Sequence, residues 1–112
     1  MNRFVVLGDL VAFNKPVTVL SASLSNFDWD YDEQPLVIKA SQIQSVLKRF
    51  IAGEFTVQEL EDWANLIECR EDLEFEEVKH EAIETAIECL ANPVLQGEIT
   101  IASCKALLNS LD

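Results

Sequence analysis

Helical periodicity from residue 41 onward is the feature that most constrains the fold of this chain. In residues 41–54 the apolar positions recur at i, i+3, i+4, i+7 and i+8, which is the pattern of one helix face. These positions are Ile43, Val46, Leu47, Phe50 and Ile51. Ser41 with Gln44 matches a capping box, and Gly53 is a typical C-terminal stop. The segment predicts an amphipathic helix.

A second capping box, Thr56 with Glu59, predicts that another helix begins almost at once. We expect its inner face to carry Val57, Leu60, Ala64 and Ile67, with Trp63 and Leu66 on the flanks. Because the link between these two helices is very short, they should be antiparallel neighbours.

Two further helices are predicted in the C-terminal part of the chain. The first runs from about Leu73 to Ala91 and ends at Asn92-Pro93, because the residue before a proline disfavours helical geometry. Its expected buried and flanking positions are Phe75, Val78, Ala82, Ile83, Ala86, Ile87 and Leu90. The second runs from Ile101 to Leu111 after Thr100 as N-cap. Its expected apolar stripe is Ile101, Cys104, Leu107, Leu108 and Leu111.

The first forty residues leave two structures open. Residues 14–27 have apolar residues at helical spacing after Pro16, although their β-branched residues weaken a helix. Residues 4–13 fit either a β-hairpin about Gly8-Asp9 or an extension of that helix. A chain of 112 residues has room for one domain. We therefore expect a single domain of the all-α (mostly α) class. It should be a compact bundle of four to five helices, with or without a short N-terminal β-hairpin.

The negative charge is concentrated in one third of the chain. The formal net charge is −12, and residues 54–90 carry thirteen acidic residues against Arg70 and Lys79. Residues 1–53 are balanced, with five acidic and five basic residues. Such a surface repels nucleic acid and anionic membranes and attracts cations or basic proteins. The sequence predicts a basic protein partner, without direct binding to nucleic acid or membrane.

Five glutamates would form a narrow strip if residues 73–91 were one helix. At about 100° per residue, Glu74, Glu77, Glu81, Glu84 and Glu88 share one side. Each like-charged i, i+4 pair costs about 0.2–0.5 kcal/mol. The strip is either a solvated face that improves solubility or a docking surface for a cationic partner. Further candidates at its margin are Asp62, Glu68 and Asp72.

A second candidate contact lies in residues 26–34, where acidic residues alternate with Trp29 and Tyr31. Aromatic residues flanked by charge are frequent anchors of protein interfaces. The alternative is a polar loop whose Trp29 packs over the core, in keeping with the burial of most tryptophans.

Motifs for catalysis or metal binding are incomplete. His80 is the only histidine, and Glu77 with His80 provides one Glu-x-x-His spacing where a di-iron site needs two. Glu84 stands where a zinc-protease helix has its second histidine. The cysteines, Cys69, Cys89 and Cys104, form no CxxC pair and favour reduced, buried thiols in a cytoplasmic protein. We therefore expect that the protein is not an enzyme and binds no cofactor and no metal ion.

Residues 29–111 resemble a family of small, uncharacterised bacterial helical proteins. The strings that carry the resemblance are "VLKRFIAGEFT", "LEDWANLIECREDLEF" and "LANPVLQGEIT". The resemblance implies a shared helical fold, with Trp63 in the core and with Glu68 and Arg70 paired locally or at its edge. It implies no activity.

In size, acidity and class, the chain is similar to bacterial toxin-immunity proteins, including small acidic helical ones that neutralise colicin nucleases. That similarity implies a cytosolic inhibitor whose carboxylate-rich helix binds a basic toxin of interbacterial competition. Trp29 and Tyr31 would then be apolar anchors. The alternative is a housekeeping adaptor or regulator that binds a protein through an apolar groove, with the acidic residues only solvated.

Overall fold

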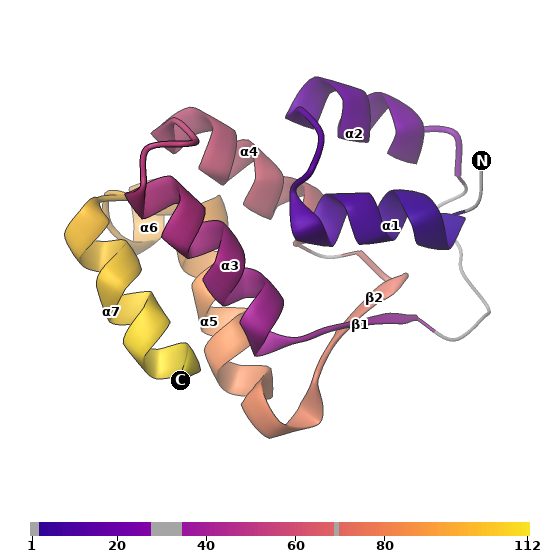
Figure 1. Cartoon of the computed structure of the whole chain (residues 1–112). Helices are drawn as coiled ribbons and strands as arrows, with labels where there is room; N and C mark the ends of the chain where they lie inside the picture. The colour runs from indigo at the N-terminus through magenta and orange to yellow at the C-terminus, as the bar shows by residue number, and fades with distance from the viewer. Residues whose placement is uncertain (1–2, 28–34, 69) are drawn as a thin grey trace.

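The computed structural model describes residues 3–27, 35–68 and 70–112 and shows mostly helical structure in them (Figure 1). The mostly α prediction is confirmed, but these residues contain seven α-helices, a 3₁₀ turn and two short strands, which is more than the four to five helices expected. The elements are α1 (Arg3–Ala12), α2 (Val17–Leu24), β1 (Leu36–Ile38), α3 (Ala40–Ile51), α4 (Val57–Ile67), β2 (Leu73–Phe75), η1 (Glu77–Lys79), α5 (His80–Ala91), α6 (Pro93–Gln96) and α7 (Ile101–Leu111).

The helices pack around one apolar core, and one of the main pairs, α3 with α7, joins helices that are distant in the chain. Helix α4 packs chiefly against α5 and α3 chiefly against α7, while α1 lies beside α2 and contacts α3, α4 and β1 (Figure 1). Consecutive helices α3 and α4 are therefore not the close antiparallel pair that their short link predicted. The apolar face of α3 is covered mainly by α7 and that of α4 mainly by α5, which removes both faces from water.

Trp63 of α4 lies at the centre of the core rather than on a flank. Its side chain is fully buried, and its indole Nε1 donates a hydrogen bond to the carbonyl oxygen of Leu10 at 2.6 Å. The ring of Phe13 stacks between this indole and Phe55, with centroid separations of 5.6 Å and 4.2 Å. The end of α1 and the segment from Phe55 to Trp63, which are distant in sequence, thus meet at one aromatic stack.

The N-terminal segment is helical, and the hairpin about Gly8 does not form. Helix α1 ends in a Schellman turn at Phe13 and Asn14, where Phe13 takes a left-handed φ of 50°. The guanidinium of Arg49 donates to the carbonyl oxygens of Ala12 (2.9 Å) and Phe13 (3.1 Å). These bonds satisfy carbonyls that the end of the helix leaves without an internal partner.

Residues 73–79 form a strand and a 3₁₀ turn instead of the first turns of a long helix. Strand β2 pairs in parallel with β1, with Leu36 opposite Leu73. The α-helix begins only at His80, and Val78, predicted to be buried, is 88% exposed. The long-range pairing overrides a local pattern that also suited a helix.

The start of α3 differs from the predicted box of Ser41 and Gln44. The helix begins at Ala40, and the backbone N–H of Lys39 donates to the side chain of Gln42 at 2.8 Å. The carboxylate of Glu76, on the segment after β2, accepts a hydrogen bond from the N–H of Ala40 at 2.8 Å. A residue distant in sequence therefore caps this helix.

Other predicted boundaries are confirmed. Thr56 and Glu59 form a reciprocal capping box at α4, Thr100 caps α7, and α5 ends at Ala91 before Asn92-Pro93. The apolar stripes hold except at their first positions, since Val57 is 42% and Ile101 51% exposed. In the part of the chain that the structure describes, every helix is too short or too polar to cross a membrane.

Candidate functional site

Three of the five strip glutamates lie on one helix. Glu81, Glu84 and Glu88 are exposed on α5 at spacings of three and four residues, so they share a face. Glu74 lies on β2 and Glu77 on η1, both exposed but outside the helix. The strip of five carboxylates on one helix was therefore wrong, because the helix that would align them begins only at His80.

The three marginal residues have different environments. Asp62 is half-buried on α4 and accepts a hydrogen bond from the side chain of Gln58 at 2.9 Å. Glu68 is the residue that follows α4, and it lines the same cleft as Glu84 and Glu88 of α5. Asp72 is 4% exposed, so it does not belong to an accessible acidic surface.

Asp72 is the centre of a buried ion cluster. Arg70 donates from Nε and Nη2 to the two carboxylate oxygens of Asp72, both at 2.9 Å. The Nε of Arg3 lies 3.6 Å from the same carboxylate and connects α1 to the segment before β2. Arg70 is thus paired with Asp72 rather than with Glu68. The role of Asp72 in the structure is to compensate these charges.

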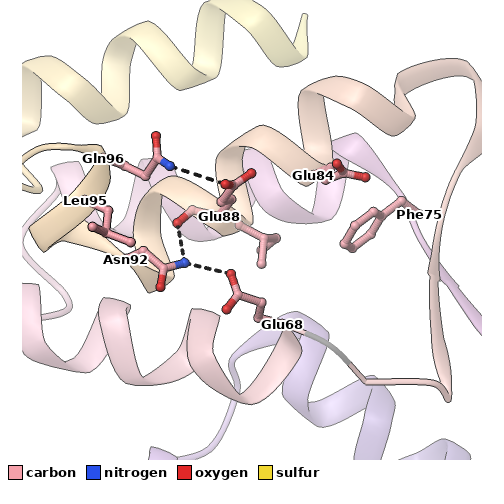
Figure 2. A pocket seen from close by; sticks show the side chains of 8 residues that line it. Glu68, Phe75, Glu84, Glu88, Asn92, Leu95 and Gln96 are labelled. Carbon is pink, nitrogen blue, oxygen red and sulfur yellow. Dashed lines mark hydrogen bonds between the residues drawn. The ribbon is translucent and has the colours of Figure 1, made fainter.

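A cleft of about 410 Å³ opens beside the exposed face of α5 (Figure 2). We call it the α5–α6 cleft. It is lined by three carboxylates, two amides and three apolar side chains: Glu68, Glu84, Glu88, Asn92, Gln96, Phe75, Ile87 and Leu95. Carboxylates from the end of α4 and from α5 therefore line the same cleft, together with three apolar side chains.

The two amides orient two of the carboxylates, as Figure 2 shows. Asn92 Nδ2 donates to Glu68 Oε2 at 2.8 Å and to the carbonyl oxygen of Glu88 at 3.1 Å. Gln96 Nε2 donates to Glu88 Oε1 at 3.3 Å. These bonds restrict the carboxylates without neutralising them, because an amide carries no charge.

The negative charge of the cleft has no lysine or arginine partner among residues 3–27, 35–68 and 70–112. The one basic side chain within 4 Å of a cleft carboxylate in these ranges is that of His80. Its Nδ1 lies 3.7 Å from Glu84 Oε2, and both side chains are about half exposed. The arginines and the lysine that do form ion pairs hold other carboxylates, those of Asp72, Asp9 and Glu54. The cleft is therefore suited to bind a cationic group.

The two cysteines in the described ranges are Cys89, which is half-buried, and Cys104, which is buried. Burial, and to a lesser extent the charge of Glu88, raises the pKa of Cys89, and burial raises that of Cys104. Both thiols are free, and their raised pKa values disfavour the nucleophilic thiolate. In the described ranges, no three His, Cys, Asp or Glu side chains gather as a metal site would require.

Trp29, Tyr31 and Cys69 lie outside the described residues. The amides and apolar residues of the cleft were missed by the sequence analysis. Asn92 was read only as the end of a helix, and Phe75 as a core position. The one usable indication was the pair Asn92 and Gln96, which follow Glu88 at intervals of four residues.

Comparisons with protein-family models, with curated proteins and with solved structures give no significant match to this chain. The function is therefore argued from the cleft, the charge and the exposed side chains.

Proposed function

We propose that this protein is a cytosolic immunity protein, an inhibitor that binds a basic toxin domain, most concretely a nuclease, through the acidic face of α5. The supporting observation is that Glu68, Glu84 and Glu88 share one cleft without a lysine or arginine partner in the described residues. Glu81 extends this acidic face along α5, and Glu74 on β2 and Glu77 on η1 are also exposed.

The charge has an energetic rationale in such a complex. Like-charged neighbours on α5 cost the free protein about 0.2–0.5 kcal/mol per pair. A cationic partner turns this repulsion into attraction and accelerates association by electrostatic steering. A nuclease must present basic residues to phosphates, so its substrate-binding face offers the complementary charge.

A second candidate is an adaptor or regulator that binds a protein through apolar contact. The observation in its favour is that Val94 and Leu95 of α6 are 96% and 81% exposed. Isolated exposed aliphatic residues are common, but two neighbours beside a cleft suit an interface. The binding of such a partner would depend little on salt.

The test begins by capturing partners from a lysate of the source cells on the immobilised protein and eluting them in steps of rising salt. The eluted protein is then purified, and its nuclease activity is titrated with the free chain. The proposal expects a basic protein, elution at high salt and stoichiometric loss of nuclease activity.

Two triple variants separate local charge from total charge. The first, Glu81→Lys with Glu84→Lys and Glu88→Lys, should slow association sharply. The second, Glu61→Lys with Glu71→Lys and Glu98→Lys, changes the net charge equally at side chains outside the cleft. A neutral partner, salt-independent elution, or equal association rates for the two variants would contradict the acidic docking face. A captured protein whose activity is unchanged would contradict inhibition.

A further inference from the structure

The α5–α6 cleft has an apolar side that the protein leaves in contact with solvent. Leu95 forms one wall of the cleft although it is 81% exposed, and Val94 beside it is 96% exposed. Phe75 and Ile87 contribute the other apolar walls, and Figure 2 shows the ring of Phe75 near Glu84. An occupant that covered these groups would gain free energy from burial.

The rim of the same cleft sets a second requirement, a positive charge. Asn92 and Gln96 each bind one oxygen of a carboxylate, Glu68 Oε2 and Glu88 Oε1. The other oxygen of each carboxylate, Glu68 Oε1 and Glu88 Oε2, receives no hydrogen bond from the described residues. Donors arriving in the cleft would therefore find acceptors already oriented, and Glu84 adds a third carboxylate.

The geometry points to an arginine side chain of a basic protein as the occupant of the α5–α6 cleft. Its methylene stem would lie against Leu95 and Phe75, and its guanidinium would donate to Glu68, Glu84 and Glu88. This inference rests on the proposed function, because it names the group by which the basic partner is held.

Arginine meets both requirements better than lysine. The guanidinium is planar and weakly hydrated, presents five donors, and can reach several carboxylates at once. It also stacks on an aromatic face such as that of Phe75. The ammonium of lysine is a compact, strongly hydrated charge that gains less from an apolar wall. The apolar side of the cleft therefore selects arginine, and its carboxylates exclude a neutral occupant.

The test titrates the ¹⁵N-labelled full chain with three short, otherwise glycine-only capped peptides that contain one arginine, one lysine or one citrulline. Citrulline keeps the shape of arginine without its charge. The reporters are the side-chain amide signals of Asn92 and Gln96, because both groups lie in the cleft. We expect saturable shifts with the arginine peptide at a dissociation constant on the order of 1 mM. The lysine peptide should bind more weakly, and the citrulline peptide should cause no shift.

Variants test the two halves of the cleft separately. Glu84→Gln removes one carboxylate charge, and Leu95→Ser removes the apolar wall. Each should weaken binding of the arginine peptide by about tenfold. The matched control, Glu71→Gln, alters an exposed glutamate outside the cleft and should bind as the unaltered chain does.

Equal affinities for the arginine and lysine peptides, or unchanged binding by Leu95→Ser, would overturn the inference in favour of a diffuse attraction. Spermidine shifting the two amides at the same concentration as the arginine peptide would also overturn it, in favour of a small polycation. This titration requires no toxin, so its outcome is independent of the inhibition assay. If the cleft binds arginine specifically but the protein inhibits no partner, the arginine site is supported and the immunity function is contradicted.

Discussion

Asn92 joins the ends of α4 and α5, because its side-chain amide donates hydrogen bonds to the Glu68 carboxylate at 2.8 Å and to the Glu88 carbonyl oxygen at 3.1 Å. Replacing Asn92 with alanine should lower the free energy of unfolding by about 1–2 kcal/mol, since one partly buried and one exposed hydrogen bond are lost. Urea denaturation measures the change. The control is Asn65→Ala, at an exposed position of α4, which should stay within about 0.5 kcal/mol. Equal effects of the two substitutions would contradict a stabilising role for Asn92.

Asp72→Ala should be the most destabilising replacement of an acidic residue by alanine in residues 54–90. It leaves Arg70 and Arg3 without the carboxylate that they share, and breaking such a buried pair costs about 3 kcal/mol. Equilibrium unfolding in urea gives the value. The neighbouring exposed Glu71→Ala provides the matched control and should change stability by less than about 0.5 kcal/mol. A loss below 1 kcal/mol at Asp72 would show that the cluster contributes little.

Glu84→Lys should stabilise the free protein while weakening the complex proposed above with a basic partner. The substitution replaces repulsion with Glu81 and Glu88 by attraction, which is worth about 0.5–1 kcal/mol in total at low salt. Thermal and urea unfolding of the variant and the unaltered chain test the sign, and the gain should shrink as salt screens the charges. Glu71→Lys controls for net charge alone. A loss of stability in Glu84→Lys would mean that the contact with His80 outweighs the repulsion on α5.

The ionised carboxylate of Asp9 should contribute a small stabilisation that is lost at acidic pH. Hydrogen bonds from Lys15 and then Asn14 lower the pKa of Asp9 below its ordinary value of 3.8. Because the folded protein holds this carboxylate ionised more strongly, the stabilisation is complete above the unfolded pKa. It is lost as the pH falls through the lower folded value.

The comparison with Asp9→Asn isolates this effect. At neutral pH the variant should be less stable by about 0.2–1 kcal/mol, as for a solvent-accessible pair. The difference should vanish once the pH is below both pKa values of Asp9. Urea unfolding of both proteins across the acidic range measures it. A difference that grew as the pH fell would contradict the assigned direction.

Local sequence rules succeeded where local interactions determine the structure. The capping box of Thr56 and Glu59 and the N-cap Thr100 use residues three positions apart, so the sequence contains the whole motif. The stop at Asn92-Pro93 is equally local, since proline restricts the residue before it. These features predicted the starts of α4 and α7 and the end of α5 correctly.

The errors arose where a distant segment supplies the deciding contact. Phe75 and Val78 fit a helical pattern, but β2 takes its hydrogen bonds from β1. Ser41 looked like a cap, yet the carboxylate of Glu76, which follows α4 and β2 in the chain, accepts the hydrogen bond from the N–H of Ala40 at the start of α3. Neither contact has a signature within a window of a few residues. The acidic region was located by its charge, whereas the cleft required α4, α5 and α6 to be placed together.

The parallel pairing of β1 with β2 also has a consequence for the order of folding. The two strands enclose α3 and α4, so their pairing must close a long loop, whereas helical turns form from local contacts. Phe75 ends β2 and reaches the α5–α6 cleft only through this closure. A chain in which α5 has formed but β1 and β2 have not yet paired therefore carries the charge of α5 without the Phe75 wall of the α5–α6 cleft.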